Sequence, residues 1–392
     1  GKCHVHGSTQ SQSFVVPFLA QMLGIEQKDL VYVAEYCGGG FGSKIAAYPV
    51  LALPGYFSRK LGRPVMLRIS SEEEYYVGSA RVGFQGWIKA GFTDDGRVSA
   101  VDLYIVQDLG PKQAGGDASS AGGAVSILYQ PDAMRLRDVP VLTNTTPRGA
   151  QRGPGEIRLR NAPDSSGTIN ADQGPITSAF MAEALNKGAE LFNWTERKKK
   201  SGQRNGSKVT GIGVGQGYHS AGAKGFDGLV RLTPDGRIHL HSGVGNLGTY
   251  SYASTTRAAA ELLKCQWDSC VIHHGNSSLH LPWSSYQAGS NTTFTHTRAN
   301  YVAAEDLLRK MKEIAAHVLG GEPSQYDIAD ERVFDRSNAA RGLTYGEVAA
   351  QAIELGGEYS GETWPDDIHQ VTQRAVQGLA GTGLIGVAKD NL

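Results

Sequence analysis

The sequence has few cysteines, no long apolar run and no net charge, and each of these shortages excludes a class of protein. Its cysteines are too few and too scattered for a disulfide scaffold, which favours a reducing compartment and therefore the cytoplasm. No apolar run reaches the roughly 18 residues that a membrane-spanning helix needs, so we expect no such helix. Basic and acidic residues number 38 each, so charge gives no reason to expect nucleic acid or an anionic membrane as a partner. The four cysteines are Cys3, Cys37, Cys265 and Cys270.

Several catalytic signatures are missing as well. The absence of a Gly-x-Ser-x-Gly elbow leaves a serine hydrolase without support. There is no His-Glu-x-x-His motif, and the paired histidines alternate within expected strands, where a core or surface position is more common than a metal ligand. Cys265 and Cys270 lack zinc-ribbon spacing, which favours a structural role. The paired histidines are His4, His6, His239 and His241.

Glycine, in contrast, is abundant, at 51 of 392 residues, about twice the usual ~7%. The glycines punctuate apolar segments, as expected for tight turns or for backbone that approaches a ligand closely. The densest run, Gly38–Gly42, is followed by Ser43 and Lys44, an order that fails the phosphate-loop motif, and its spacing also fails the dinucleotide fingerprint. A simple turn is one interpretation, but four glycines around Phe41 favour contact with a bound group.

Apolar periodicity and turn residues predict alternating strands and helices. Asp94-Asp95-Gly96 indicates a β-hairpin, because Asp-Gly favours a tight turn between strands. The expected strands of the first part are 3–6, 30–34, 84–92 and 97–107. The expected helices of the whole chain outside the repeat described next are 14–22, 45–61, 178–198, 300–319 and 344–355.

The order of elements at the start of the chain returns in the second half. Pro234-Asp235-Gly236 predicts a hairpin between strands 228–233 and 237–241. A polar loop, a helix over 254–263 and a strand around 270–272 follow. The 392 residues exceed an ordinary domain. We therefore predict an α+β fold of two duplicated units, residues 1–160 and 161–392.

Two further segments invite interpretation. Gly211–Gly217 alternates glycine with other residues, which favours a strand packed tightly against another layer. Arg148 and Arg152 lie among glycines and prolines in a rigid cationic loop. Their guanidinium groups could offer forked donors to an oxyanion or a phosphate. Surface arginines in a turn are an alternative that these residues support equally.

Taken together and in order, several segments resemble the molybdopterin-binding large subunit of the xanthine dehydrogenase/aldehyde oxidase family. The resemblance covers nearly the whole chain, and the spacing from Gln10 to Phe41 is that of the family. It implies the α+β molybdenum-cofactor-binding fold of these enzymes. The matching segments are Ser8-Thr9-Gln10, Gln21 to Ile25, Gly38 to Lys44, Arg152 to Gly155 and Ala288-Gly289-Ser290.

The resemblance implies contacts around a metal rather than direct ligation by the chain. In the family, the metal is held by the pterin dithiolene and by oxo, sulfido and hydroxyl groups. Gln10 matches the glutamine that hydrogen-bonds a metal oxygen, and Arg152 matches the arginine beside the metal group. Residues implied to bind the cofactor are Gly39, Gly40, Phe41, Gly42, Arg152, Gly289 and Ser290. Residues implied to contact the metal group are Gln10, Phe41, Arg152 and Gly289.

The family's reaction is hydroxylation with water as the oxygen source. The resemblance therefore implies an enzyme with a molybdenum–molybdopterin cofactor, for which the cytosine dinucleotide form is one option. It also implies partners that carry a 2Fe-2S cluster and FAD, on an iron–sulfur subunit and a flavin subunit. A small organic substrate completes the set, and a second molybdopterin-subunit fragment is a further expected partner.

The chain also departs from the family pattern. The family's upstream part lies before Gly1, its base glutamate lies beyond Leu392, and a helix's worth of residues is missing between Glu156 and Ile157. Ile45 replaces a glutamate that purine oxidisers use, and Ala121-Gly122-Gly123-Ala124 offers no substrate arginine. These differences argue against purines and favour an aldehyde or an aromatic N-heterocycle.

Three alternatives remain at this point. One is a family member that performs a different reaction on an aromatic or hydrocarbon-derived substrate. Another is a non-catalytic binding or scaffold subunit, which would lack molybdenum in its active form. The third is a nucleotide-binding module, which would require tight binding of ATP or NAD by the isolated chain.

Overall fold

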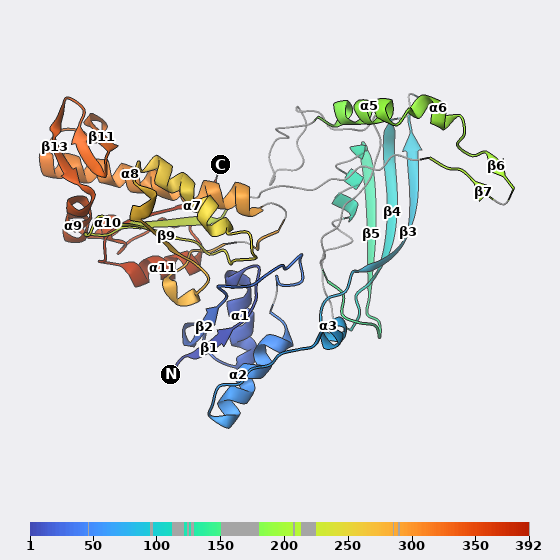
Figure 1. The fold of residues 1–392 in the computed structure, drawn as a ribbon, viewed down its shortest axis with the longest axis horizontal. Helices are drawn as coiled ribbons and strands as arrows, with labels where there is room; N and C mark the ends of the chain where they lie inside the picture. Colours follow the sequence, from blue (N-terminus) through green and yellow to red (C-terminus); the bar gives the residue numbers. More distant parts are fainter. Residues whose placement is uncertain are drawn as a thin grey trace. The chain divides into compact units, whose positions relative to one another are not determined.

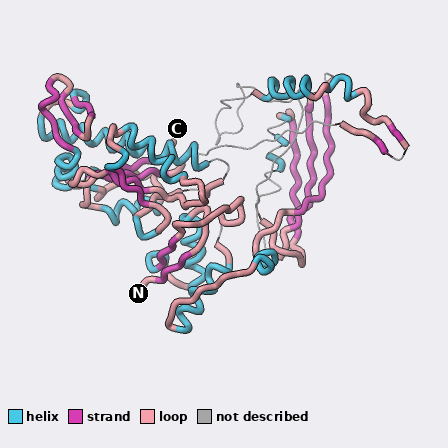
Figure 2. Tube along the Cα trace, in the orientation of Figure 1, coloured by secondary structure: helices cyan, strands magenta, loops and turns pink. Residues whose placement is uncertain are grey.

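The computed structural model describes residues 1–45, 47–94, 97–111, 121–123, 125–126, 129–149, 180–206, 208–212, 225–284, 286–288 and 291–391. The chain forms two compact units, one of residues 1–68 with 221–392 and the other of residues 69–220. Both contain helices and strands (Figure 1, Figure 2), which confirms the α+β class. The division into repeats at 1–160 and 161–392 stays a prediction. In the described part of the chain, no helix combines the length and the apolar character needed to cross a membrane.

The first unit opens with two parallel strands joined by a helix. Strand β1 (Cys3–His6) pairs with β2 (Leu30–Val33), and Cys3 lies opposite Leu30. Helix α1 (Gln12–Leu23) and the short 3-10 turn η1 (Gln27–Asp29) make the crossover between them. The strand and helix predictions for this region are confirmed.

Local sequence determines where α1 begins and ends. The Ser11 side chain accepts a hydrogen bond from the Phe14 backbone N–H at 3.3 Å, as an N-cap does. Gly24 ends the helix with a φ of 64°, a left-handed conformation that glycine adopts without a steric penalty. Apolar residues of the helix and strands then form one buried cluster: Val5, Val15, Leu19, Leu23, Leu30 and Tyr32 among others.

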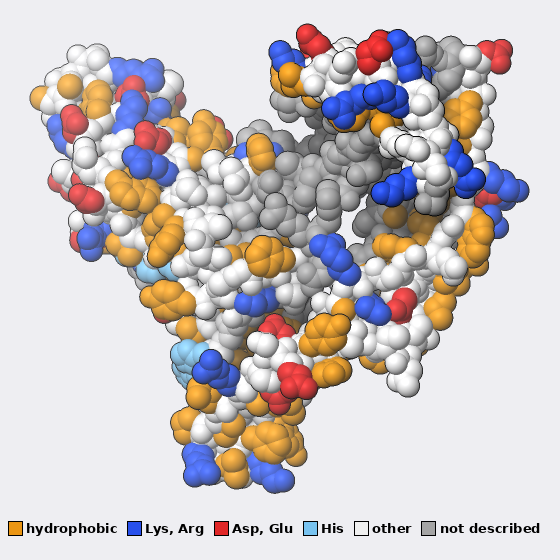
Figure 3. Space-filling view, turned by 45° about the vertical axis from the view of Figure 1, so that its right-hand side comes forward, with side chains coloured by type: hydrophobic (Ala, Val, Ile, Leu, Met, Phe, Trp, Pro, Cys, Tyr) orange, Lys and Arg blue, Asp and Glu red, His pale blue; other side chains and the backbone are white. Residues whose placement is uncertain are grey.

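The helix predicted over 45–61 is shorter than expected. Helix α2 spans Pro49–Leu61, with Pro49 at its first position. The residue before a proline is disfavoured in the α region, and Tyr48 is extended at φ −137° and ψ 160°. The expectation that the helix begins at Ile45 is therefore wrong. Apolar side chains of α2 also gather on the surface (Figure 3), namely Leu53, Tyr56, Phe57 and Leu61.

The predicted repeat of element order is confirmed. Strand β9 (Ile238–His241) pairs in parallel with β10 (Cys270–His273), as β1 does with β2. Helix α7 (Ser251–Leu262) and the 3-10 turn η3 (Trp267–Ser269) connect them. Both crossovers thus consist of a helix followed by one 3-10 turn.

A four-stranded sheet with the order β10-β9-β8-β14 carries the main core. Strand β8 (Asp227–Leu232) forms the predicted hairpin with β9, and β14 (Leu384–Lys389) pairs antiparallel with β8. Helices α7 and α8 (Thr297–Leu319) cover one face and α11 (Gln370–Leu379) the other (Figure 1). Alternate residues of β8 serve the two faces, because strand side chains point to opposite sides: Val230 and Leu232 on one side, Leu229 on the other.

The remaining elements of the first unit complete this core. Helix α8 is the longest and was expected over 300–319, and α9 was expected over 344–355. Thr344 caps α9 through a capping box with Glu347. The bounds are η4 Ser277–Leu279, π-helical η5 Thr292–His296, α8 Thr297–Leu319, η6 Pro323–Gln325, β11 Tyr326–Ala329, β12 Arg332–Asp335, β13 Asn338–Thr344, α9 Tyr345–Leu355 and α10 Gly357–Ser360.

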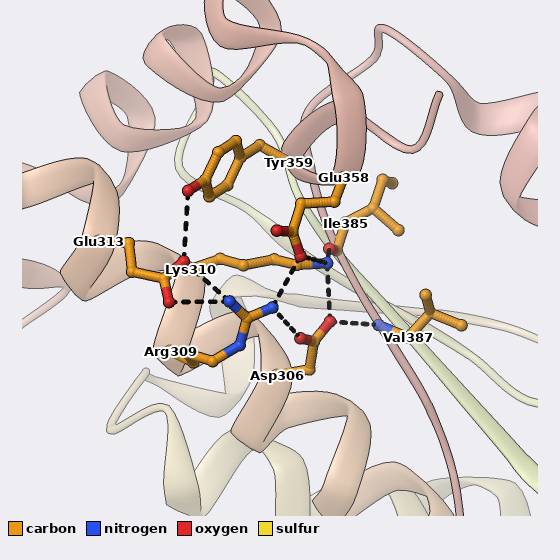
Figure 4. A network of polar contacts seen from close by, with 8 residues as sticks. All are labelled: Asp306, Arg309, Lys310, Glu313, Glu358, Tyr359, Ile385 and Val387. Carbon is orange, nitrogen blue, oxygen red and sulfur yellow. Dashed lines mark hydrogen bonds and ion pairs between the residues drawn. The ribbon is translucent and has the colours of Figure 1, made fainter. Parts of the chain in front are cut away.

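A buried lysine ties α8 to β14 and α10 (Figure 4). Lys310 is 2% exposed, and its Nζ donates to the Ile385 carbonyl at 2.9 Å and pairs with Asp306 at 2.8 Å. The Asp306 oxygen that pairs with Lys310, Oδ2, also accepts a hydrogen bond from the Val387 backbone N–H at 3.0 Å. Arg309 completes the cluster by pairing with Asp306, Glu313 and Glu358.

The second unit is built on a three-stranded sheet with the order β3-β4-β5. Strands β3 (Gly83–Phe92) and β4 (Val98–Asp108) form the predicted hairpin, and β5 (Ala133–Val141) pairs in parallel with β4. Other described elements are α3 Ser71–Val77, α5 Met181–Leu191, α6 Trp194–Lys198, β6 Arg204–Asn205 and β7 Lys208–Val209.

The helix predicted over 178–198 is interrupted. Asn193 has a φ of 54°, so the chain turns out of α5 and enters α6 one residue later. Asparagine tolerates this left-handed conformation better than most residues. The strand expected at Gly211–Gly217 lies largely outside the described residues; the first two residues, Gly211 and Ile212, are not in a strand.

Candidate functional site

The glycine run follows β2 as an irregular turn rather than as the start of a helix. Gly38 and Gly42 have φ values of 62° and 105°, a left-handed region that favours glycine. Phe41 also has a positive φ, 53°, which is unusual for an aromatic residue, and its side chain is 64% exposed. The turn is closed by Ser43, whose N–H donates to the Gly40 carbonyl at 2.9 Å.

Gln10 lies beneath this turn and holds it. The side chain is 1% exposed. Its Oε1 accepts the backbone N–H of Gly42 at 3.0 Å and that of Lys44 at 3.2 Å. Its backbone N–H donates to the Lys44 carbonyl at 2.8 Å. The early glutamine and the glycine turn, both singled out from the sequence, therefore form one structure.

The same glutamine joins the two halves of the first unit. Gln10 Nε2 donates to the Gln287 carbonyl at 2.8 Å, and the Gln287 N–H donates to the Gln10 carbonyl at 2.9 Å. These residues are separated by 277 positions in the sequence. The segment before Ala288 is thus fixed directly beside the glycine turn.

Further contacts support the turn from below. Lys44 Nζ donates to the Cys37 carbonyl at 2.7 Å, and the Cys37 N–H donates to the Asn246 carbonyl at 2.9 Å. Thr9 Oγ1 donates to the Ser11 carbonyl at 2.9 Å and to the Lys44 carbonyl at 3.2 Å. A loop from the second repeat therefore supports the turn of the first.

Two glycines of the turn are needed for close packing. A Cβ on Gly40 would overlap the side-chain amide of Gln10, with Cδ only 2.6 Å away. A Cβ on Gly39 would lie 2.6 Å from the Phe41 ring. Both distances are shorter than the 3.0 Å below which a Cβ and another heavy atom are essentially never found. A larger residue at position 40 would therefore displace Gln10, and one at position 39 would displace Phe41.

The residues present fit an anionic, oxygen-rich group. Among the described residues, the backbone N–H groups of Gly39, Gly40 and Phe41 have no hydrogen-bond partner. Successive free N–H groups in a turn make a binding surface for anions. Gln287 Oε1, buried in the adjoining segment, also lacks a partner, and a buried polar atom of this kind is normally satisfied.

The other predicted site residues cannot be placed. Arg152, Gly289 and Ser290 lie outside the described residues. Arg148, from the same predicted cationic loop, is described and is occupied by an internal contact in the second unit. Its guanidinium pairs with Asp108 at 3.0 Å, and hydrogen bonds from Thr143 and the Gly110 N–H hold the pKa of Asp108 below its usual value.

Sequence reasoning missed the residues that support Gln10. Lys44 was noted as evidence against a phosphate loop and as the end of the matching segment Gly38 to Lys44, but not as a support of the turn. Gln287 and Asn246 were not singled out. The signal available for Gln287 was weak, since it directly precedes the Ala288-Gly289-Ser290 segment. Every residue has a backbone carbonyl, so a contact through this group places no constraint on residue type and cannot be predicted from a sequence pattern.

The predicted strand histidines of the second repeat are stacked together. His241 packs on His273 at a centroid distance of 4.5 Å, and His239 Nδ1 lies 2.8 Å from His273 Nε2. Burial, together with Arg231 and His273, lowers the pKa of His239 to about 4, so this imidazole is neutral at pH 7. In the described ranges, no group of three or more histidine, cysteine, aspartate or glutamate side chains is arranged to hold a metal ion.

Comparison with protein families gives two matches along the chain. Residues 1–162 and residues 187–382 each match a family described as a molybdopterin cofactor-binding domain. The second match alone covers half of the chain. The Gln10–glycine turn lies in the first match, and Gln287 lies in the second.

Curated relatives point in the same direction. The chain is 27% identical over 370 residues to the probable hypoxanthine oxidase XdhD of Escherichia coli K12, covering 83% of this chain and 38% of that protein. It is 25% identical over 369 residues to the aldehyde oxidoreductase molybdenum-binding subunit PaoC of the same organism, covering 86% of this chain and 49% of that protein. The chain therefore spans less than half the length of these two relatives.

Solved structures share the fold. Quinoline 2-oxidoreductase from Pseudomonas putida 86 matches with a TM-score of 0.67 at 18% identity, covering 99% of this chain and 52% of that one. Aldehyde oxidoreductase from Desulfovibrio gigas matches with a TM-score of 0.64 at 22% identity, covering 79% of this chain and 37% of that one. At these identities the likeness establishes the fold.

Proposed function

Because this chain belongs to the xanthine dehydrogenase/aldehyde oxidase family and matches its molybdopterin cofactor-binding domain twice, we propose that it is the molybdenum-cofactor-binding part of a hydroxylase. The observation that carries the proposal is the Gln10 contact with the glycine turn. A buried side-chain amide orders a loop in which three successive backbone N–H groups have no hydrogen-bond partner among the described residues.

The residues of the turn have distinct roles in this proposal. The backbone N–H groups of Gly39, Gly40 and Phe41 bind anionic oxygens of the cofactor. Gln10 orients the turn by accepting the Gly42 N–H at its Oε1. It orients the segment that contains Gln287 by donating from its Nε2 to the Gln287 carbonyl. When bound, the molybdenum–molybdopterin group supplies the oxidising centre at which an oxygen derived from water is transferred to substrate. Arg152, Gly289 and Ser290 complete the cofactor contacts in this proposal.

We propose an aldehyde or an aromatic N-heterocycle as the substrate. Ile45 places an apolar side chain directly after the glycine turn, in a position where purine oxidisers carry a glutamate. An apolar wall suits an uncharged aromatic or aldehyde substrate better than a polar purine. Electrons would leave through a 2Fe-2S cluster and FAD on partner subunits or domains, and the cytosine dinucleotide form of the cofactor remains part of the proposal.

The proposal is tested on the native assembly that contains this chain. Molybdenum is measured by mass spectrometry and pterin by the fluorescence of its oxidised form, and benzaldehyde and quinoline are offered in ¹⁸O-labelled water. We expect about one molybdenum per chain and ¹⁸O in the hydroxylated product of at least one probe. An active assembly without molybdenum would overturn the proposal in favour of a scaffold role.

A matched pair of variants locates the site. Gln10→Leu should lower molybdenum and pterin content, because the turn loses two side-chain hydrogen bonds. Gln377→Leu, at an exposed position on α11, is the control and should leave both contents unchanged. Equal loading of the two variants would contradict the assignment of the site to Gln10 and the glycine turn.

A further inference from the structure

Two of the four cysteines meet at the second crossover of the first unit, where the chain passes from α7 to β10. The Sγ atoms of Cys265 and Cys270 lie 3.6 Å apart, and both are free thiols. Both residues are partly exposed, and β10 is the edge strand of its four-stranded sheet. The pair of thiols therefore lies near the surface of the unit.

The turn that carries the two thiols is held by a single carboxylate oxygen. The N–H of Gln266, directly after Cys265, donates to Glu331 Oε1 at 3.2 Å. Ser269 Oγ, directly before Cys270, donates to the same oxygen at 2.6 Å. Because both sides of the turn are tied to one atom, the two sulfurs are held together before any bond forms between them.

The sulfurs are within reach of a covalent bond. A disulfide bond is about 2.05 Å long, so closing the 3.6 Å contact requires an approach of about 1.5 Å. A modest rotation of each side chain about its Cα–Cβ bond moves Sγ by a distance of this order. The pair can therefore exist as a dithiol or as a disulfide on the same turn.

The contact makes the two thiols chemically unequal. A hydrogen bond from Cys265 lowers the pKa of Cys270, against the opposing effects of burial and of the Glu331 carboxylate. The same contact, with burial, raises the pKa of Cys265. The thiolate is the reactive form of cysteine. Cys270 is therefore the expected nucleophile, and Cys265 is the thiol that attacks second.

We propose that Cys265 and Cys270 form a site of reversible thiol–disulfide exchange with small disulfides, for which oxidised glutathione is the probe. The proposal is independent of the cofactor site.

The exchange proceeds in two balanced steps. The Cys270 thiolate attacks one sulfur of oxidised glutathione, and the first glutathione leaves and takes up the proton that Cys270 released. Cys270 is then no longer a thiolate, so the contact that most raised the pKa of Cys265 is lost. Cys265 attacks Cys270 Sγ, and the second glutathione leaves with the Cys265 proton. The two cysteines lose two electrons, and one glutathione disulfide becomes two thiols.

The test uses the native assembly that contains this chain. It is incubated with oxidised glutathione, the remaining thiols are blocked with iodoacetamide, and the protein is digested with trypsin. Cleavage after Lys264 and Arg298 recovers both cysteines in one peptide of residues 265–298. We expect this peptide to be unblocked and two hydrogen atoms lighter than its reduced form. An excess of reduced glutathione should restore both thiols.

Cys3 is the control within the same molecule. It is a free, partly exposed thiol like the pair, but burial raises its pKa. Its reaction with oxidised glutathione should be about 10-fold slower, because less of it is thiolate. Cleavage after Lys2 and Lys28 places it in a separate peptide, so both rates come from one digest.

Two serine variants assign the roles of the two thiols. In Cys265→Ser, a mixed disulfide between Cys270 and glutathione should accumulate, because no second thiol is left to displace it. In Cys270→Ser, glutathione should add to Cys265 about 10-fold more slowly than to Cys270 in the first variant. Thermal unfolding checks that both variants are folded, and the unchanged protein tests the exchange even where a variant is not.

Other outcomes would overturn the proposal. Both cysteines also pack against the main core, and no reaction of the 265–298 peptide would assign the pair to packing alone. Addition of glutathione without closure would show that the sulfurs cannot meet. Oxidation of Cys3 at the same rate would show unselective chemistry, and a disulfide that reduced glutathione cannot open would show a permanent bond. None of these results bears on molybdenum loading, so this failure is distinguishable from a failure of the proposed function.

Discussion

Gln10 Oε1 accepts the backbone N–H of Gly42 at 3.0 Å, although 32 positions separate the two residues in the sequence. The contact places a buried side-chain amide under a turn whose own conformation depends on glycine. Through Gln287, Gln10 is also one of the points at which the two repeats of the first unit meet. Perturbing either partner should therefore affect stability as well as cofactor binding.

Gln10→Leu should lower the free energy of unfolding by about 2–3 kcal/mol. The change removes three side-chain hydrogen bonds from a buried position, and such bonds contribute about 1 kcal/mol each. Urea denaturation of the cofactor-free chain measures this loss, with Gln377→Leu as the surface control. A loss no larger than that of the control would contradict the bridging role of Gln10.

Gly40→Val should block cofactor loading by displacing Gln10 from the turn. Gly40 is among the residues that the family resemblance implies to bind the cofactor, so a direct clash between valine and the cofactor is the alternative explanation. In the structure, the added Cβ instead overlaps the Gln10 amide. We therefore expect loss of molybdenum and also a lower melting temperature without cofactor. Gly188→Ala is the control, because its Cβ meets nothing within 4 Å and alanine favours the helix it lies in. An unchanged melting temperature for Gly40→Val, together with loss of molybdenum, would favour the direct clash with the cofactor.

Lys310→Met should destabilise the first unit by about 2–4 kcal/mol. The lysine is buried, and its loss removes a hydrogen bond to Ile385 and an ion pair of 2.8 Å with Asp306. Arg309→Met changes a side chain that is 47% exposed and should cost less, since exposed ion pairs contribute about 0–1 kcal/mol. Thermal unfolding of both variants checks the order. The reverse order would show that the surface pairs of Arg309 dominate the network in Figure 4.

Acidification should destabilise the first unit partly through His296. Burial lowers the pKa of this histidine from 6.5 to about 4. The unfolded chain therefore binds a proton near pH 6.5 that the folded chain accepts only near pH 4. Stability is lost as the pH falls between these values, by about 3 kcal/mol at most.

His296→Phe tests this pH dependence. The variant keeps an aromatic ring against Phe226, which stacks on His296 at a centroid distance of 5.7 Å, and removes the titrating group. Free energies of unfolding measured between pH 7 and pH 4 should then fall less steeply than in the unchanged protein. Identical slopes would rule out His296 as a contributor.

Much of the local structure follows from sequence patterns. The strands at 3–6 and 30–34, both hairpins and the repeated order of elements were predicted from period-two and helical apolar spacing and from Asp-Gly turns. The errors have local causes. Helix α2 begins only at Pro49, because Tyr48 before the proline is extended. Asn193, in a left-handed conformation, interrupts the helix expected over 178–198. A proline and an asparagine are both known helix-boundary residues, but the apolar periodicity of each segment was given more weight in the predictions.

The candidate site was predictable only in part. Gln10 and the run from Gly39 to Gly42 were singled out from the sequence, and the structure joins them. Their partners could not be found in this way. The Gln287 and Asn246 contacts use backbone carbonyls, which every residue possesses.

The amino-acid sequence alone determined the fold class and the repeated order of elements, because apolar periodicity and turn residues act over short distances along the chain. The family came from the resemblance of several ordered segments, such as Ser8-Thr9-Gln10 and Gly38 to Lys44. Tertiary structure alone decided which polar groups are satisfied. It paired Gln10 with Gly42 and Gln287, and it buried Lys310 beside the carboxylate of Asp306. Hydrogen bonds and burial depend on groups that are distant along the chain, so only the folded arrangement can settle them.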